Sequence, residues 1–276
     1  MSGRLFLVAT PIGNLGDVTL RALEVLSNVK IIACEDTRRT RVLLEAHRIG
    51  TPTTSLPAFA EGERAGALIA RLVAGDDVAV VTDAGSPGIS DPGERLVVEA
   101  VEAGVDVIPV PGPAALVAAL TASGLPTGRF HFLGFLPRQT SDARQMLEEI
   151  VPLSASVILY ESPRRLFETL ELLTKVLGDR RACVGRELTK VHEELVRGRL
   201  SALVERYRGA EVLGEVVVVV EGRTGPTRWE EAEVMAALDA GLRGGERLKA
   251  VAADVAGRAG WTSQAVYRLG LKVQGR

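Results

Sequence analysis

The stretch Val78–Gly93, VAVVTDAGSPGISDPG, joins an apolar run to a loop of Asp, Gly, Ser and Pro that leads into a helix start. The apolar run is typical of a buried strand, and in open α/β sheets ligands bind where such strands end. Gly85, Gly88 and Gly93 let backbone approach a ligand closely, and Asp83 can accept hydrogen bonds from it. We therefore expect a binding site here. The alternative is a loop that only connects the strand to the helix. Such connections usually need about two to six residues, and this loop is longer.

The pattern on both sides of this stretch predicts an α/β protein. Short apolar runs alternate with helical patterns up to Pro111–Pro113, which argues for βαβ units on a mostly parallel sheet. The alternation then resumes and ends at Glu215–Val220, a valine-rich run typical of a strand covered on both faces. A Gly/Pro/Thr linker follows, and the rest of the chain reads as helical. We predict two α/β domains, 1–112 and 113–224, and a small helical segment with helix-turn-helix spacing, 225–276.

Two other strand exits have a similar composition. Ala9–Asp17, ATPIGNLGD, and Val107–Leu116, VIPVPGPAAL, both run from an apolar strand through Pro and Gly to a helix. Adjacent strand ends of this kind line one pocket when the strands are parallel. Neither exit is a GxGxxG or a Walker motif, so dinucleotide oxidoreduction and P-loop phosphoryl transfer lose their main sequence support.

Charged residues mark the remaining exits. In CEDTRRT and the residue after it, two carboxylates, Glu35 and Asp36, precede three arginines, Arg38, Arg39 and Arg41. Acidic residues at a helix start are favoured by the helix dipole, so the carboxylates also have a purely structural explanation. The arginines are suited to hold phosphates of a polyanion, although a solvated helix face has the same appearance.

In the second predicted domain, the exits YESPRR and RELTKVHEE mix acids with bases. The candidate general bases and anion-binding groups there are Glu161, Arg164, Arg186, Glu187, Lys190, His192 and Glu193, and their pairing cannot be read from the sequence.

The composition excludes some classes of protein and some kinds of site. A formal net charge of -2 at pH 7 excludes a uniformly basic protein but not a local basic patch. Cys34 and Cys183 stand alone in apolar runs, which indicates core thiols of a reduced, intracellular protein rather than a disulfide or a zinc site. No His/Asp/Glu spacing is typical of a metal site. The apolar run near the N-terminus is too short for a signal peptide or a membrane span, so we expect a cytoplasmic protein without membrane contact.

The segment from Arg243 onward is locally basic. Leu248, Val251, Ala252 and Val255 recur at helical spacing, and after a turn with glycine Thr262 is placed to cap a second helix. Basic residues outnumber acidic ones in this segment, which is typical of a nucleic-acid-binding surface. The alternative is a helical cap that packs on the main body.

The motifs ATPIGNLGD, EDTR, TDAGSPGISDPG, PVPGPAAL, YESPRR and RELTK, in this order and spacing, closely resemble the tetrapyrrole methylase-like family, also called class III S-adenosylmethionine methyltransferases. Within that family the chain resembles the branch of 16S ribosomal RNA cytidine 2′-O-methyltransferases, and the resemblance covers essentially the whole chain. Gly85 and Ser86 stand where tetrapyrrole enzymes have Asp and Pro. This departure argues against a porphyrinoid substrate.

The resemblance implies a homodimer whose two α/β domains fold S-adenosylmethionine into the cleft between them, with no metal. It implies a substrate cytidine in the decoding region of 16S ribosomal RNA, in the small ribosomal subunit. The positions that it assigns to cofactor binding are Pro11, Asp83, Ala84, Gly85, Ile89, Ala114, Ala115, Glu161, Val220, Glu221 and Gly222.

The methyl group on the sulfonium of S-adenosylmethionine is already activated. The enzyme must therefore mainly align this methyl donor with the ribose hydroxyl that accepts the methyl group, and exclude water. A ribose hydroxyl is a weak acid, and a positioned base accelerates its reaction by about 10² to 10⁴. Our hypothesis is that Glu35 or Asp36 orients or deprotonates the 2′-hydroxyl, with Lys190 as the competing candidate and Arg38 holding a phosphate. The further candidates for substrate binding are Arg39, Arg164 and Arg186.

Two other functions remain open from the sequence. The first is methylation of a tetrapyrrole or another small molecule with the same cofactor. Such a reaction does not require the basic segment from Arg243 onward. A nucleic-acid-binding regulator that keeps the α/β body as a ligand sensor needs a helix that reads duplex DNA, and the last helix offers few base-reading side chains beyond Gln264 and Arg268.

Overall fold

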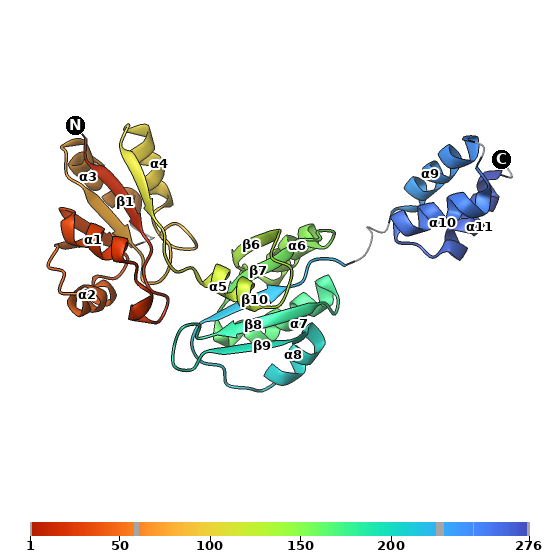
Figure 1. Cartoon of the computed structure of the whole chain (residues 1–276). Helices are drawn as coiled ribbons and strands as arrows, with labels where there is room; N and C mark the ends of the chain where they lie inside the picture. Colours follow the sequence, from red (N-terminus) through yellow and green to blue (C-terminus); the bar gives the residue numbers. More distant parts are fainter. Residues whose placement is uncertain (1, 58–60, 225–228, 245, 275–276) are drawn as a thin grey trace. The chain divides into compact units, whose positions relative to one another are not determined.

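The computed structural model describes residues 2–57, 61–224, 229–244 and 246–274 (Figure 1). The chain forms two compact units, one of Met1–Glu148 with Ala155–Glu221 and one of Glu149–Ser154 with Gly222–Arg276. The first unit holds two five-stranded sheets with interleaved helices, and the second is helical. The predicted fold class is therefore confirmed, whereas the division into three domains at the predicted boundaries stays a prediction.

The first sheet consists of β1 (Arg4–Val8), β2 (Ile31–Cys34), β3 (Thr53–Ser55), β4 (Val78–Val81) and β5 (Asp106–Val110). Its strand order is β3-β2-β4-β1-β5, and every neighbouring pair is parallel, as predicted. Because the strands are parallel, their carboxyl ends share one edge: Val8 pairs with Val110, and Cys34 pairs with Val81. The loops that follow these strands therefore leave the sheet together.

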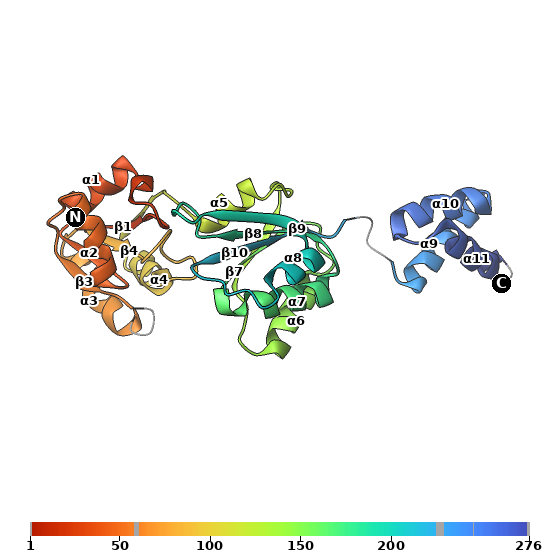
Figure 2. The same cartoon turned by 90° about the horizontal axis from the view of Figure 1, so that it is seen from below.

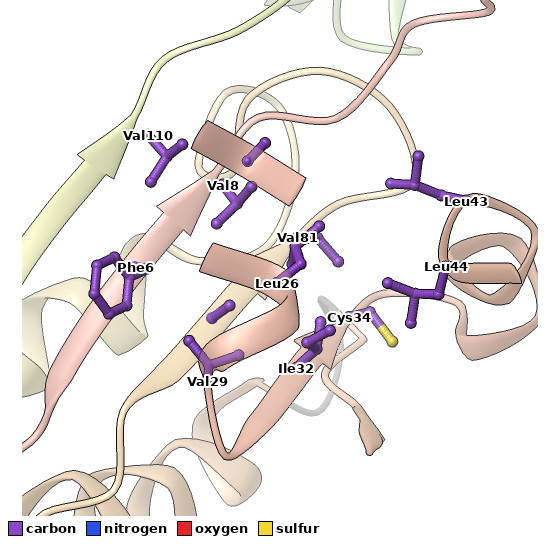
Figure 3. Close-up of a cluster of buried hydrophobic side chains, with 12 residues drawn as sticks. Phe6, Val8, Leu26, Val29, Ile32, Cys34, Leu43, Leu44, Val81 and Val110 are labelled. Carbon is purple, nitrogen blue, oxygen red and sulfur yellow. The ribbon is translucent and has the colours of Figure 1, made fainter. Parts of the chain in front are cut away.

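Helices cover both faces of the first sheet. On one face, α1 (Leu20–Asn28) and α2 (Thr37–Ala46) pack on Phe6, Val8 and Cys34 (Figure 3). On the other face, α3 (Glu61–Val73) and α4 (Glu94–Glu102) pack on Leu5 and Val80. Successive strand residues alternate between the two cores, and both faces are apolar because both are buried. The short 3-10 helix η1 (Leu15–Asp17) lies between β1 and α1.

The second sheet consists of β6 (Phe130–Phe135), β7 (Ser156–Glu161), β8 (Arg181–Arg186), β9 (Glu194–Arg199) and β10 (Val216–Val220). Its order is β6-β7-β10-β8-β9, and β10 runs antiparallel to both of its neighbours. All five valines of β10 are buried, which confirms the prediction of a strand covered on both faces. Alternation of strands and helices in the sequence did not reveal that this sheet is mixed.

The helices of this part are α5 (Ala115–Ala122), α6 (Thr140–Ile150), η3 (Pro163–Arg165), α7 (Leu166–Leu177) and α8 (Leu200–Tyr207). Leu116, Ala119 and Leu120 of α5 share a core with Ile158, Cys183 and Val219, and α7 and α8 lie on the other side of the sheet (Figure 2). Cys34 and Cys183 are both buried free thiols, as predicted.

The reversed direction of β10 has one consequence for the site. Val216, at its amino end, pairs with Glu161 of β7 and with Arg186 of β8. The carboxyl ends of β7 and β8 are therefore level with the start of β10, so the segment before β10 joins the loops after β7 and β8.

The second unit contains α9 (Glu231–Arg243), α10 (Leu248–Ala259) and α11 (Ser263–Gln274), which share one apolar core. Gly260 ends α10 in the left-handed conformation, and the Thr262 hydroxyl accepts a hydrogen bond from the Ala265 amide at 3.2 Å. The predicted helices and cap are confirmed. In the described ranges, no helix is long and apolar enough to span a lipid bilayer.

Candidate functional site

The first compact unit contains a cavity of about 380 Å³, within the size range of small-molecule and cofactor sites. Loops after strands of the first sheet form one side of it, and segments from the edge of the second sheet form the other. Its lining includes Glu35, Arg39, Asp83, Gly85, Asp91, Tyr160, Glu161 and Glu215.

Backbone contacts hold the loops of the first sheet in place. The Thr10 amide donates to the Gly85 carbonyl at 2.8 Å, and the Gly85 amide donates back to the Thr10 carbonyl at 3.1 Å. The Asp36 amide donates to Asp83 Oδ1 at 3.1 Å, and Arg39 lies 3.4 Å from Asp83 Oδ2. The loops after β1, β2 and β4 are thereby joined to one another, with Asp83 at the centre.

Two loops at the cavity contain residues other than glycine with positive φ. Ser90 has φ 62°, and Glu187 and Thr189, which flank the lining residue Leu188, have φ 49° and 66°. Such conformations are uncommon outside glycine and concentrate at functional sites. They indicate that the surrounding contacts constrain both loops.

Many of the site residues predicted from the sequence and from the resemblance line this cavity. Those on the lining are Glu35, Arg39, Asp83, Ala84, Gly85, Ile89, Ala114, Ala115 and Glu161. Pro11 directly precedes Ile12, which lines the cavity. The exits around EDTR, DAGSPG and PGPAA thus converge because parallel strands end at one edge.

The structure does not bring Val220 and Glu221 to the cavity. Because β10 is antiparallel to β7, its start and not its end lies at the cavity, where Val216 and Val217 take part in the lining. Val220 pairs with Val157 near the start of β7. Glu221 is 3.5 Å from Arg181, and Gly222 belongs to the second compact unit.

The two other predicted catalytic groups lie off the lining and are engaged elsewhere. Asp36 caps α2 by accepting from the Arg38 amide at 2.8 Å and forms an ion pair with the same arginine. These hydrogen bonds from Arg38 lower the pKa of Asp36 to about 2. Lys190 donates to Glu187 at 2.8 Å and to Glu215 at 3.2 Å, and its aliphatic chain packs over Gly13.

The predicted substrate-binding arginines differ in their surroundings. Arg39 lines the cavity, whereas Arg38 lies outside it with a side chain that is 87% exposed. Arg164 is exposed in η3, and Arg186 is 3.3 Å from Glu194. The groups best placed to meet an approaching polyanion are therefore Arg38 and Arg39 at the start of α2.

Carboxyl groups dominate the electrostatics of the cavity. Burial, and then the charge of Asp83, raises the pKa of Glu35 above its ordinary value. Burial, and then the charges of Glu35, Asp83 and Glu215, raises the pKa of Asp91 to about 7. A cavity of this kind favours a positively charged ligand, because the ligand relieves the repulsion among the acids.

Sequence reasoning did not select Asp91, Tyr160 or Glu215. Asp91 stands inside the quoted motif as the second aspartate of TDAGSPGISDPG, so its position between Ser90 and Pro92 was the available signal. The Tyr160 hydroxyl accepts a hydrogen bond from the Leu116 amide at 3.3 Å, at the start of α5. Glu215 precedes β10, and only the reversed direction of that strand brings it to the cavity.

Glu161 lines the cavity with a side chain that is fully buried and hydrogen-bonded within the protein. It accepts from the Ser162 amide at 2.7 Å and from the Thr169 hydroxyl at 2.5 Å. Its oxygens are thus occupied by the chain itself. This arrangement suits a residue that holds the end of β7 against α7.

Replacing Glu161 by Ala is expected to lower the free energy of unfolding by about 3 kcal/mol, since it leaves buried donors without their acceptor. Urea unfolding measures this change. Glu168→Ala, an exposed glutamate of the same helix as Thr169, is the matched control and should change stability by less than about 0.5 kcal/mol. Unchanged stability together with lost cofactor binding in the Glu161 variant would instead make Glu161 a cofactor ligand.

Comparisons with known proteins agree with this geometry. Residues 4–204 match the family of tetrapyrrole (corrin/porphyrin) methylases. The chain belongs to this family. It is 51% identical over 218 residues to the ribosomal RNA small subunit methyltransferase I of Mesorhizobium japonicum, covering 78% of this chain and 74% of that protein. It is also 41% identical to the protein of the same name from Pseudomonas aeruginosa, covering 100% of this chain and 99% of that one.

A solved structure, the uroporphyrin-III C-methyltransferase of Thermus thermophilus in complex with S-adenosyl homocysteine, shares the fold. Its TM-score is 0.60 at 21% identity, over 79% of this chain and 97% of that one. The likeness concerns the fold alone. As a member of the tetrapyrrole methylase family, the chain is a methyltransferase enzyme.

Proposed function

We propose that this methyltransferase transfers a methyl group from S-adenosylmethionine to the 2′-hydroxyl of a cytidine in the decoding region of 16S ribosomal RNA. The observation that carries the proposal is the acid-lined cavity at the converging strand exits, in a chain that shares 41% identity over its whole length with a ribosomal RNA small subunit methyltransferase I. Glu35 of the motif EDTR and several residues of DAGSPGISDPG, two motifs that resemble the ribosomal RNA branch, line this cavity.

The residues of the cavity fit S-adenosylmethionine. The cofactor carries a positive sulfur and an ammonium group, and Glu35, Asp83, Asp91 and Glu215 supply negative charge or proton acceptors around the space. Gly85 adds no side chain at the point where the loop borders the cavity. When bound, S-adenosylmethionine supplies an electrophilic methyl carbon. We assign its binding to Asp83, Ala84, Gly85, Ile89, Ala114 and Ala115.

In the proposed reaction the chain's own residues orient the RNA and exclude water. Glu35 lines the cavity and accepts a hydrogen bond from the ribose hydroxyl, which orients the oxygen. Arg39 neutralises Asp83, which it approaches to 3.4 Å. Arg38, exposed beside the cavity at the start of α2, binds a neighbouring phosphate.

The second unit adds a basic surface that we assign to RNA binding. Within its described residues, Arg243 and Arg258 pair with Asp239 and Asp254, respectively. The exposed basic side chains that form no ion pair there are Arg247, Lys249, Arg268 and Lys272. Gly270 lets α11 pack directly against Leu248, and each of the four basic residues is within two positions of Leu248 or Gly270 in the sequence. We call them the basic cluster.

We also propose that the enzyme acts as a homodimer in the cytoplasm. The homodimer is the assembly that the resemblance to this family implies. The cytoplasm is where a bacterial ribosomal RNA meets its modifying enzymes.

A methyl-transfer assay tests the proposed function. The protein is incubated with S-adenosylmethionine, with or without a chelator, and with small ribosomal subunits or 16S RNA from cells that lack it. We expect one ribose-methylated cytidine per RNA, located by nuclease digestion and mass spectrometry, at a rate that the chelator does not change. Methylation of a base, or of a small molecule but no RNA, would contradict the proposal.

A further inference from the structure

A phenylalanine ring lies exposed on the lining of the cavity. Phe135, the last residue of β6, is 55% exposed, and it lines the cavity together with Tyr160 of β7. Large aromatic side chains usually bury most of their surface, because their removal from water is strongly favourable. Aromatic side chains also line ligand sites, where they pack against the ligand. The ring of Phe135 is therefore available to a ligand that enters this cavity.

A β-bulge in β6 turns this ring toward the cavity. Phe132 pairs with Ile158 and Phe135 pairs with Tyr160, so three steps along β6 match two steps along β7. In a regular strand, residues three positions apart point to opposite faces of the sheet. The extra residue puts Phe132 and Phe135 on the same face, where both rings contact Tyr160. Gly134, within the bulge, has φ 63°, which its residue type allows.

The aromatic neighbours of Phe135 fix its ring but leave one face of it free. The ring centroids of Phe135 and Tyr160 are 5.7 Å apart with an interplanar angle of 62°, which is an edge-to-face contact. Tyr160 is itself held by Phe132, at 4.9 Å between centroids, and by the Leu116 amide, which donates to its hydroxyl at 3.3 Å. An edge-to-face contact uses an edge or one face of a ring. At least one face of Phe135 is therefore left uncovered by Tyr160.

The backbone on both sides of Phe135 is also held in place. A Cβ added at Gly134 would lie 3.2 Å from Oγ of Ser90, so the end of β6 packs closely against the loop after β4. On the other side, Arg165 donates to the carbonyls of the two residues after Phe135, at 3.2 and 3.1 Å. A side chain on a backbone that is fixed in this way is suited to bind a ligand in one orientation.

Two arginines near this ring are available to bind phosphates. Arg138 follows Phe135 by three residues, and Arg164 directly follows Pro163, which lines the cavity. Both arginines are exposed, and within the described residues neither forms an ion pair. The hydrogen bonds of Arg165 tie the two segments that carry them to each other. Aromatic rings combined with unpaired arginines are typical of surfaces that bind single-stranded RNA.

We propose that Phe135 is the platform on which the base of the target nucleotide stacks, an inference that rests on the proposed function. To bring its 2′-hydroxyl to a methyl donor in the cavity, the nucleotide must turn out of the RNA strand, and its base then loses its stacking neighbours. Stacking on an aromatic side chain replaces this loss. Arg138 and Arg164 hold phosphates next to the nucleotide that has turned out.

The adenine of the cofactor is the other base that could stack on this ring. The residues to which we assign the cofactor follow β4 and β5 of the first sheet, whereas Phe135 ends a strand of the second sheet. S-adenosylmethionine carries positive charge, which unpaired arginines repel, whereas RNA is a polyanion that they attract. The charges beside the ring therefore favour the base of the RNA.

Photo-crosslinking with a substituted RNA tests the assignment directly. The probe is a small ribosomal subunit reconstituted with 16S RNA that carries 5-iodocytidine at the methylated position, because this base crosslinks to an aromatic ring on which it stacks. We expect a crosslink to Phe135, located by mass spectrometry and lost in Phe135→Leu. Phe130→Leu is the matched control, since Phe130 is 44% exposed at the other end of β6 and off the cavity lining, and this variant should keep the crosslink. No crosslink to Phe135 from an RNA that the enzyme methylates would contradict the inference.

Single-turnover methyl transfer at saturating cofactor measures how much the stacking contributes. Phe135→Leu should lower the transfer efficiency, which is the rate divided by the enzyme concentration at half-saturation, by about tenfold. Phe135→Trp should retain most of the efficiency because it restores an aromatic face, and Phe130→Leu should behave as the wild type. The Tm of Phe135→Leu should stay near that of the wild type, since the ring is largely exposed.

The salt dependence of RNA affinity tests the two arginines. Arg138→Gln with Arg164→Gln should reduce the slope of log affinity against log salt by about 1.5, because two phosphate contacts are lost. Phe135→Leu should leave this slope unchanged, since it removes no charge. An unchanged slope in the double arginine variant would remove the charge that favours RNA at this ring and count against the inference.

Calorimetry with S-adenosylmethionine distinguishes the two sources of a base. We expect Phe135→Leu to bind the cofactor within about twofold of the wild type. A loss of cofactor affinity of about tenfold, with unchanged transfer efficiency at saturating cofactor, would assign the ring to adenine and overturn the inference. A wild type that methylates no RNA would refute the proposed function, and the inference with it. An active wild type with equal transfer efficiency in Phe135→Leu would refute the inference alone.

Discussion

Neutralising the basic cluster is expected to weaken binding of small-subunit RNA by about 10²-fold while cofactor affinity stays within about twofold. Arg247, Lys249, Arg268 and Lys272 are exposed and form no ion pair in the described residues, so their charges are available to phosphates. Each phosphate contact releases counterions and contributes about 0.7 to 0.9 to the slope of log affinity against log salt. Changing all four to Gln should therefore reduce that slope by about 3.

The matched control for this variant is Arg243→Gln with Arg258→Gln, which removes basic charges already paired with Asp239 and Asp254. Fluorescence anisotropy with labelled RNA at several salt concentrations measures affinity and slope together. An unchanged slope in the fourfold variant would make the helical unit a structural element without an RNA contact.

A deletion that tests the same surface must begin at residue 225. Removing only Arg243–Arg276, the segment singled out by its basic charge, would cut through one core, because Val234 and Leu238 of α9 pack with Val251 and Val255 of α10. The exposed apolar remainder of α9 would then confuse the result. Deletion of 225–276 removes the three helices together and should reproduce the loss of RNA affinity.

Replacing Gly85 by Val is expected to lower cofactor affinity more than tenfold and the free energy of unfolding by about 2 kcal/mol. Gly85 has φ 82°, a conformation that a β-branched residue rarely adopts. Its amide and carbonyl both bond to Thr10, so the strain is transmitted to the loops that border the cavity. Space is a smaller problem, because a Cβ at this position would lie 3.5 Å from Ile12.

Gly104→Val is the matched control for backbone strain. Gly104 has φ 70°, lies between α4 and β5, and has no other atom within 4 Å of an added Cβ. Its variant should lose similar stability in urea unfolding yet bind S-adenosylmethionine as the wild type does in calorimetry. Equal loss of cofactor affinity in both variants would attribute the effect to general destabilisation, not to the loop.

Most of the first sheet and its strand exits were predictable because their signals are local. Val78–Val81 is apolar on both faces, and Gly85, Gly88 and Gly93 all have the positive φ that their residue type allows. The caps of α2 by Asp36 and of α11 by Thr262 are also short-range effects of side chain on backbone. Such features depend on residues a few positions apart, so the sequence by itself determined them.

The second side of the cavity depends on pairing between distant segments. A valine run is equally compatible with either strand direction, and only the antiparallel pairing of β10 places Glu215 and not Glu221 at the cavity. The pKa of Asp91 is likewise raised by burial first, and then by carboxyls that include Glu35 and Glu215, more than fifty and more than one hundred residues away in sequence. Burial and charge act through space. The sequence therefore determined which residues follow each strand, whereas the tertiary structure decided which of them face one another and which carboxyl keeps its proton near neutral pH.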